Sequence, residues 1–455
     1  MTSHPFRSRP RLGRALAVAA VLVAGLLAAA PASAGRIQRV VSPSGIEAWL
    51  VEEHAVPLIA LEFSFAGGST QDPAGKEGLA NLMSTLLDEG AGDMTSQAFQ
   101  TRLEDLAVDL SFSEDPDRFS GEMKTLSENR DAAFDLLALA LAKPRFDKEA
   151  VERMRVQAIA ALRRSERNPE VVASRAWAKA VFGTHPYARP GRGTEASVSA
   201  IEPADLKALH ARLFARKDLK IAVVGDIDAA TLGPALDRIF GALPAEGKLV
   251  PVAEVQPLGG VRAREVLAVP QATIRFGGPG LKRADPDFIA AYVMNHILGG
   301  GSFSSWLYTE VREKRGLAYS IATGLAPLVH SGQFLGAVGT SADRVDETIG
   351  LVRTQIERMR DQGPTAAELA AAKAYLTGSY PLRFDTSDKI AASLLGIQIE
   401  NLGIDYIDKR NAMIEAVTLD DVKRVAKRLF VGDLSLVVVG PDVPQAAPTP
   451  EPAKK

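Results

Sequence analysis

The sequence of 455 residues contains no cysteine. This absence excludes a disulfide scaffold, a thiol nucleophile and a zinc site built from cysteines. Imidazole is then the strongest nitrogen ligand left for a transition metal, and the chain has only six histidines: His4, His54, His185, His210, His296 and His330. No two of them are close enough in sequence to form a metal pair on one helix face. The formal net charge is only −2, so the sequence also lacks a basic surface for nucleic acid.

The first 34 residues have the pattern of a cleavable export signal. Four arginines precede an uninterrupted run of apolar residues and glycine at residues 15–30, and Ala32 and Ala34 then flank Ser33 as at a signal-peptidase site. We therefore expect cleavage after Ala34 and a mature protein in a bacterial periplasm. An uncleaved anchor is the weaker alternative, because the run is shorter than the roughly 20 residues that span a bilayer. Without the signal no polybasic segment is left, so we expect no stable membrane insertion.

The rest of the chain contains a weak internal repeat. Residues 212–214 read Arg-Leu-Phe and are followed by a β-branched stretch that ends in glycine and aspartate at residues 225 and 226. The same Arg-Leu-Phe returns at residues 428–430, before a second β-branched stretch that ends at Gly440. Each half also opens with a strand that runs into a pair of glycines, at residues 58–65 and 272–276. A duplicated unit of this kind predicts an α+β fold that is used twice.

The repeat and the local composition predict the domain boundaries. We expect a first domain at residues 35–245, a linker containing proline and glycine at residues 246–260, and a second domain at residues 261–440. Residues 441–455 contain five prolines and cannot form a core, so we expect a disordered tail.

Apolar periodicity predicts individual elements in the first half. Apolar residues at positions 59, 61, 63 and 65 alternate with Glu62 and Ser64, which predicts a strand with one covered face. Apolar residues at positions 79, 82, 83, 86 and 87 follow helical spacing, and so do those between positions 151 and 162.

Two stretches resemble one known family. Residues 298–305 read Leu-Gly-Gly-Gly-Ser-Phe-Ser-Ser, and residues 307–320 read Leu-Tyr-Thr-Glu-Val-Arg-Glu-Lys-Arg-Gly-Leu-Ala-Tyr-Ser. Together they resemble the second-domain signature of the insulinase, pitrilysin and mitochondrial processing peptidase family. His185, Pro186 and Tyr187 are similar to a loop of the family's first domain. The resemblance covers nearly all of the mature chain and implies two homologous domains, each a mostly antiparallel sheet packed against helices.

Members of this family that cut peptides carry the inverted zinc motif H-x-x-E-H on a helix, with a carboxylate from a later helix as third ligand. Here the two imidazole positions fall on Asn81 and Thr85, and the general base falls on Ser84. The later carboxylate, placed by register, falls on Ala160 or Ala161. Hydroxyl and amide groups are poor zinc donors beside imidazole and carboxylate. The resemblance therefore implies that this chain binds no metal and that zinc belongs to a partner subunit.

Arg312 and Tyr319 match the spacing of an arginine and a tyrosine that zinc-bearing relatives require from their second domain. The resemblance implies that both reach the zinc domain, bind the substrate carbonyl and stabilise the developing oxyanion. From the residues alone, Arg312 could instead pair with an acid on an exposed helix, and Tyr319 could pack in a core. The glycine-rich loop consists of Gly299, Gly300, Gly301 and Ser302. The resemblance implies that this loop contacts the peptide, although the same glycines are also suited to the end of a helix.

These patterns favour a non-zinc, substrate-binding or regulatory subunit of a periplasmic zinc metallopeptidase complex, inactive alone. Its partner would be a homologous subunit that carries H-x-x-E-H, and its substrates would be peptides. The alternative is a pseudo-peptidase that acts as a binding or scaffold protein, which would lack the zinc ligands in the same way. A third hypothesis, an independent peptidase whose scattered histidines form a rearranged site, predicts zinc in the isolated chain.

Overall fold

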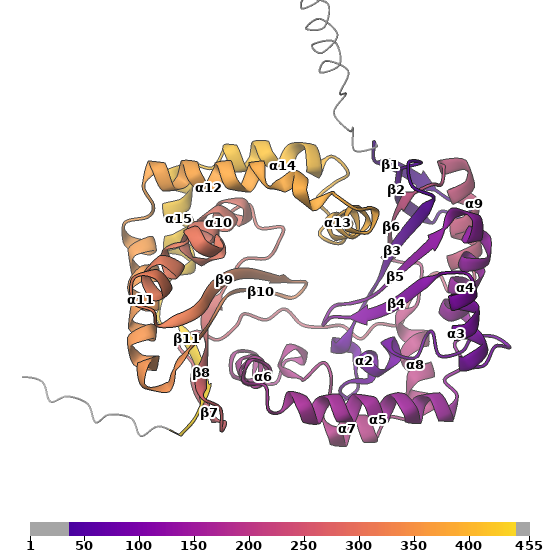
Figure 1. Cartoon of the computed structure of the whole chain (residues 1–455), viewed down its shortest axis with the longest axis horizontal. Helices are drawn as coiled ribbons and strands as arrows, with labels where there is room; N and C mark the ends of the chain where they lie inside the picture. Colours follow the sequence, from indigo (N-terminus) through magenta and orange to yellow (C-terminus); the bar gives the residue numbers. More distant parts are fainter. Residues whose placement is uncertain (1–35, 443–455) are drawn as a thin grey trace, which may run out of the picture.

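The computed structural model describes residues 36–442, so the predicted signal and nearly all of the predicted tail lie outside the described residues. Within that range the chain forms two sheets with helices packed on them, and the two halves lie side by side (Figure 1). None of the helices between residues 36 and 442 is long and apolar enough to cross a membrane.

The first half consists of one sheet and eight α-helices. Its strands are β1 Gln38–Val41, β2 Glu47–Glu52, β3 Leu58–Ala66, β4 Asp109–Glu114, β5 Arg118–Leu126 and β6 Lys220–Gly225. Its helices are α2 Leu79–Ser84, α3 Ser96–Asp105, α4 Arg130–Ala142, α5 Lys148–Ser165, α6 Pro169–Phe182, α7 Glu195–Ser199, α8 Pro203–Leu213 and α9 Ala229–Phe240. Short 3₁₀ turns are η1 Ser69–Gln71, η2 Ser127–Asn129 and η3 Pro186–Ala188.

The second half repeats this plan. Its strands are β7 Arg262–Val266, β8 Gln271–Pro279, β9 Ala318–Leu328, β10 Ser331–Ser341 and β11 Ser435–Gly440. Its helices are α10 Phe288–Asn295, α11 Val345–Asp361, α12 Ala366–Gly378, α13 Ser387–Ile399, α14 Tyr406–Glu415 and α15 Leu419–Leu429. Two π-helical turns are η4 His296–Gly300 and η6 Tyr308–Glu313, and three 3₁₀ turns are η5 Ser302–Ser304, η7 Ala342–Arg344 and η8 Tyr380–Arg383.

The two sheets have the same strand order. The first runs β1-β2-β6-β3-β5-β4 and the second runs β7-β11-β8-β10-β9, so the second sheet corresponds to the last five strands of the first. Only one pair in each sheet is parallel, β2 with β6 and β7 with β11, and the other neighbours are antiparallel. The predicted α+β fold with two mostly antiparallel sheets is confirmed.

Each half contributes one helix to the sheet of the other half. Helix α13 packs on β6 and β3, where Leu394 and Leu395 belong to one buried apolar cluster with Val224 and Ala60. Conversely, α6 packs on the second sheet, and its Trp177 donates a hydrogen bond of 2.9 Å from Nε1 to Oε1 of Gln333. The two halves are therefore joined by buried apolar contacts.

The helix α13 also explains an error in the sequence-based prediction for β3. The apolar residues Ile59, Leu61, Phe63 and Phe65 are fully buried, as expected. Ala60 and Ser64, on the opposite face, are 4% and 0% exposed, so β3 has two covered faces rather than one. The covering helix comes from residues more than 300 positions away in the other half, and the local alternation of β3 contains no information about it.

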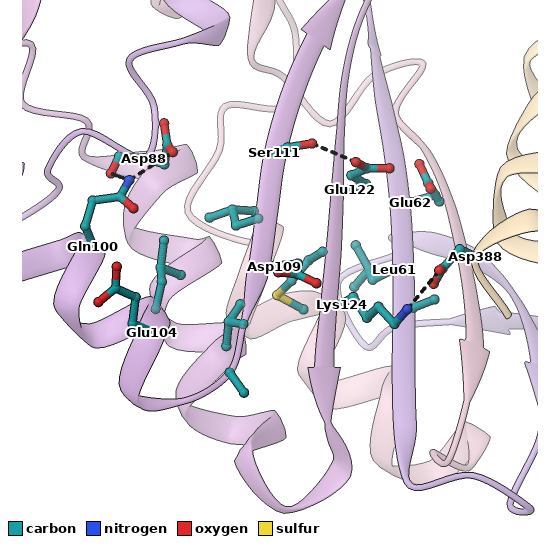
Figure 2. A pocket seen from close by; sticks show the side chains of 16 residues that line it. Leu61, Glu62, Asp88, Gln100, Glu104, Asp109, Ser111, Glu122, Lys124 and Asp388 are labelled. Atoms are coloured by element: carbon teal, nitrogen blue, oxygen red, sulfur yellow. Dashed lines mark hydrogen bonds and ion pairs between the residues drawn. The ribbon is translucent and has the colours of Figure 1, made fainter.

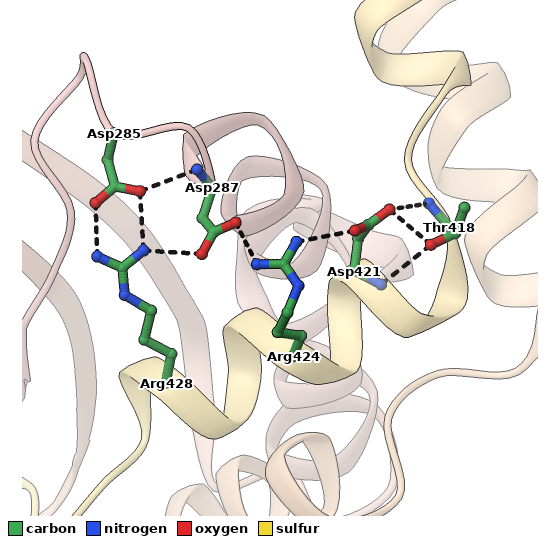
Figure 3. A network of polar contacts seen from close by, with 6 residues as sticks. All are labelled: Asp285, Asp287, Thr418, Asp421, Arg424 and Arg428. Atoms are coloured by element: carbon green, nitrogen blue, oxygen red, sulfur yellow. Dashed lines mark hydrogen bonds and ion pairs between the residues drawn. The ribbon is translucent and has the colours of Figure 1, made fainter.

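A cluster of ion pairs fixes the last helix of the second half, α15, to the turn before α10 (Figure 3). Arg428 bridges two carboxylates, with nitrogen–oxygen distances of 2.7 Å to Asp285 and 2.8 Å to Asp287. Arg424 joins Asp287 to Asp421, and Asp421 caps the start of α15 with Thr418. The arginine of the repeated Arg-Leu-Phe in the second half thus forms ion pairs that connect α15 to the start of α10.

Candidate functional site

The predicted metal-motif positions lie on or directly after α2, which begins at a turn that requires glycine. Gly78 has φ = +92°, a left-handed conformation that favours glycine, and a Cβ there would lie 2.7 Å from the carbonyl oxygen of Arg192. The buried carboxylate of Asp72 accepts hydrogen bonds from the backbone N–H groups of Gly78, Leu79 and Ala80 at 2.9 to 3.1 Å. The turn therefore anchors α2 and brings the loop that carries Arg192 against it.

The helix expected to continue to residue 87 ends at Ser84. The Ser84 hydroxyl donates to the carbonyl of Asn81, and the Thr85 hydroxyl donates to the carbonyl of Leu82, each at 2.8 Å. Such local bonds from serine and threonine compete with regular helical bonds. Leu86 and Leu87 remain fully buried in the turns that follow.

The zinc ion that the family implies does not fit these residues. The hydroxyls of Ser84 and Thr85 already donate to helix carbonyls, and Nδ2 of Asn81 donates to Glu114 over 3.4 Å. Ala161 of the facing helix α5 lines one cavity together with Asn81 and Thr85, and it is one of the two alanines that register places at the third-ligand position. An amide, a threonine hydroxyl and an alanine provide no imidazole or carboxylate to hold zinc.

The described histidines are engaged elsewhere. His54 contacts Asp226 at 2.7 Å, His210 contacts the carbonyl of Leu141 at 2.7 Å, and burial lowers the pKa of His210. His185 caps the η3 turn, consistent with a structural role for its loop. Across residues 36–442, no group of three or more histidine, aspartate or glutamate side chains could hold a metal ion. The rearranged zinc site of the third hypothesis therefore has no counterpart in the described chain.

In the second half, Arg312 lies among aromatic side chains. Its guanidinium carbon is 4.9 Å from the ring centres of both Tyr308 and Tyr319, and the guanidinium donates a hydrogen bond to the Tyr308 hydroxyl. Tyr308 is 7% exposed, whereas Tyr319 is 83% exposed. The alternatives of an Arg312 ion pair and a core-packed Tyr319 are both wrong, because Arg312 has no carboxylate partner among the described residues and Tyr319 faces solvent.

Sequence reasoning overlooked an aromatic residue of this cluster, Phe303. Its ring is 71% exposed and packs edge-on against Tyr308 with 5.1 Å between ring centres. The sequence could have indicated this exposure, since Phe303 directly follows the glycine-rich loop and is not part of a helical or strand-like apolar pattern that would bury its ring. Arg312 thus contacts the rings of Tyr308 and Tyr319 directly, and Phe303 packs on the Tyr308 ring. An arginine and a phenol at an exposed surface can donate hydrogen bonds to a peptide carbonyl.

The glycine-rich loop continues α10 as the π-helical turn η4 instead of ending the helix with a simple cap. Gly299 is buried, and a Cβ on it would lie 2.5 Å from the Thr323 hydroxyl; a Cβ on Gly301 would lie 2.6 Å from the carbonyl of His296. These two glycines are therefore required by packing. Gly300 and Ser302 are exposed, so they are the members of the predicted loop that a ligand can reach.

The tips of two hairpins, one from each sheet, meet at Tyr187. Its hydroxyl donates to Asp117 at 2.7 Å and accepts a bond of 3.0 Å from the backbone N–H of His330. Asp117 also accepts from the backbone N–H of Val329 at 3.0 Å. Burial raises the pKa of Tyr187, so the phenol stays protonated. The His-Pro-Tyr stretch therefore links the β4–β5 turn to the β9–β10 turn.

A cavity of about 660 Å³ near the edge of the first sheet is lined by several acidic side chains (Figure 2). Glu62 on β3 stands directly opposite Glu122 on β5, and Asp388 of α13 lies beside them in an ion pair of 2.9 Å with Lys124. Burial and the neighbouring carboxylates raise the pKa of Glu62 to about 8. The carboxylates of Glu62, Glu122 and Asp388 therefore repel one another where α13 packs on the first sheet.

Two family profiles match consecutive parts of the chain. "Insulinase (Peptidase family M16)" matches residues 51–195, and "Peptidase M16 inactive domain" matches residues 200–376. Together they cover more than half of the sequence. The chain therefore belongs to the M16 peptidase family, and the resemblance predicted from the motifs is confirmed.

Individual relatives refine this assignment. The chain is 27% identical over 396 residues to the "Non-peptidase homolog YmxG" of Helicobacter pylori, covering 85% of this chain and 90% of that protein. It is 25% identical over 422 residues to the "Uncharacterized zinc protease SCO5738" of Streptomyces coelicolor, covering 90% of each. The crystal structure of an M16 inactive domain from Pseudomonas fluorescens matches with a TM-score of 0.84 and 30% identity over 90% of this chain and 98% of that one. A Helicobacter pylori protease structure, at 19% identity and a TM-score of 0.81, shares the fold.

Proposed function

We propose that this protein is the non-zinc, substrate-binding subunit of a periplasmic zinc metallopeptidase complex and has no peptidase activity alone. Its partner would be a homologous M16 subunit that carries H-x-x-E-H and holds the zinc ion. Peptides would be the substrates. The signal-like residues 1–34 support the periplasmic location.

One observation carries this proposal: a half-buried Arg312 beside an exposed Tyr319 occurs in a chain whose own metal positions are Asn81, Ser84 and Thr85. The pair has no catalytic centre in its own first half to serve. A planar guanidinium and a phenol can hold a peptide carbonyl and stabilise the oxyanion that forms when zinc-activated water attacks it. In the proposed complex, the water and the general base come from the partner, and Arg312 and Tyr319 of this chain polarise the carbonyl.

The test is hydrolysis of a quenched fluorescent peptide by this chain, by the zinc-bearing subunit and by their mixture. We expect turnover only in the mixture, and a decrease of about 100-fold for Arg312→Ala. Arg315→Ala is the matched control, because Arg315 lies on the same segment but pairs with Glu310. If Arg312→Ala and Tyr319→Phe leave the mixture unchanged, the assigned roles are wrong. A stable complex with a protein that lacks zinc would instead favour the scaffold alternative.

A further inference from the structure

A cavity of about 390 Å³ occupies the place where the metal motif lies in zinc-bearing relatives. It is bounded by α2 and α5, and the loop before α7 contributes Arg192. Its apolar walls are Leu82, Met154, Ala158, Ala161 and Leu162. Cavities of this size lie within the range of ligand pockets. The loss of the zinc ligands has therefore left an open, largely apolar pocket.

The charge of this pocket is opposite to that of a metal site. Arg164 and Arg192 line it, and none of its lining residues is acidic. Both arginines are exposed, and among the contacts within residues 36–442 neither guanidinium has a hydrogen-bonded or salt-bridged carboxylate, although Arg192 lies near enough to Glu114 to act on its charge. Arg163, the neighbour of Arg164, does pair with Glu195 and does not line the cavity. Two guanidinium groups without a salt-bridge partner in the pocket repel a metal cation and attract an anion.

The apolar walls narrow the class of anion. Inorganic phosphate would leave the surface of Leu82, Met154 and Leu162 uncovered, whereas an apolar group attached to a carboxylate would bury that surface and reach the arginines. Gln157, also in the lining, adds an amide that can donate to the same ligand. Glu114 is a nearby carboxylate whose charge acts on Arg192, but it is not part of the lining.

We infer that this pocket binds the C-terminal residue of a peptide, with an apolar side chain against α2 and α5 and the terminal carboxylate at Arg164 and Arg192. The choice of a peptide as occupant rests on the proposed function; the carboxylate and its apolar group follow from the pocket itself. In this view the former metal site has become a binding site for one end of an extended peptide.

The test is direct binding to the isolated full chain, measured by fluorescence anisotropy. The probes are two labelled pentapeptides that end in Ala-Leu, one with a free carboxylate and one with a C-terminal amide. We expect the free acid to bind at least about ten-fold more tightly, because charge-assisted hydrogen bonds to two arginines form only with the carboxylate. Equal affinity of the acid and the amide, or no binding of either, overturns the inference.

Variants locate the binding. Combining Arg164→Gln with Arg192→Gln should abolish the preference for the acid, while the control Arg163→Gln should retain it. Ala161→Phe should fill the cavity and weaken both peptides, and circular dichroism checks that each variant is folded. If Arg163→Gln abolishes the preference as strongly as the double variant, the carboxylate is not bound in this pocket.

A second arm separates the sources of the carboxylate. Octanoate should displace the peptide acid only weakly. If octanoate binds and the peptide acid does not, the occupant is a small apolar acid and the assignment to peptides is wrong. The outcome is also distinct from that of the proposed function, which is measured by turnover in the mixture. Loss of turnover in Arg312→Ala with no carboxylate preference in the isolated chain would leave the proposed function standing and remove this inference.

Discussion

The guanidinium carbon of Arg312 lies 4.9 Å from the centre of the Tyr319 ring. Because Tyr319 is 83% exposed, this cation–π contact, rather than a surrounding core, holds the phenol in place. Arg312 is itself held by the hydroxyl of buried Tyr308. Tyr308 therefore acts as a positioning residue: it does not reach the exposed surface, but it fixes the two side chains that do.

Tyr308→Phe should lower turnover of the proposed mixture with a zinc-bearing subunit by about five-fold, since one hydrogen bond of about 1 kcal/mol is lost. A positioning role predicts that kcat falls while the KM for the peptide changes little. Tyr375→Phe is a suitable control, because Tyr375 is an exposed ring that stacks on His296 instead. Unchanged kcat in Tyr308→Phe, with Arg312→Ala inactive, would show that Arg312 needs no anchor.

The Glu62 cluster predicts a pH-dependent stability. The pKa of Glu62 in the folded protein is about 8, above its ordinary value of 4.5, because of burial and the adjacent Glu122 and Asp388. Between these two pH values the folded state holds a proton that the unfolded state has released. The free energy of unfolding should therefore fall as pH rises from about 5 to about 8.

Glu62→Gln should flatten this slope and raise the melting temperature at pH 8, as measured by thermal unfolding at several pH values. Glu104→Gln is the control, since Glu104 lines the same cavity but is exposed. An identical slope in wild type and Glu62→Gln would mean that other groups dominate the pH dependence.

The N-terminus of α2 depends on one buried carboxylate. Asp72→Ala removes the acceptor of three backbone N–H groups and should lower the free energy of unfolding by about 2 kcal/mol or more. Asp228→Ala provides a comparison, because Asp228 caps α9 through the single N–H of Thr231 and is exposed. Its loss should cost about 1 kcal/mol. Equal losses in urea denaturation would contradict the special role of Asp72.

Local sequence patterns predicted the parts of the fold whose causes are local. The duplicated sheets followed from the Arg-Leu-Phe repeat and the glycine-ended strands, and the absence of zinc ligands followed from Asn81, Ser84 and Thr85 in register. The end of α2 was missed because the apolar spacing continues to Leu87, whereas the hydroxyl bonds of Ser84 and Thr85 end the helix. The exchange of α6 and α13 was missed because it depends on contacts between the two halves.

The same limit applied to the site. The spacing of Arg312 and Tyr319 could be read directly, but the exposed ring of Phe303 and the anchor Tyr308 depend on how η5 and η6 fold back. The two arginines of the apolar cavity come from α5 and from a loop 28 residues further along the chain, so no motif joins Arg164 to Arg192.

The exchange of helices predicts that the two halves unfold together. Leu394 of α13 is fully buried in the cluster that contains Trp49 of the first sheet, so Leu394→Ala should lower the stability by about 2 to 5 kcal/mol. Because α13 belongs to the second half and covers the first, the change in tryptophan fluorescence and the loss of helical circular dichroism should coincide in a single transition. Leu382→Ala is the control, since Leu382 is 74% exposed and should change stability by less than about 0.5 kcal/mol. Separate transitions for the two signals in the wild-type chain would show that the halves are independent despite the exchanged helices.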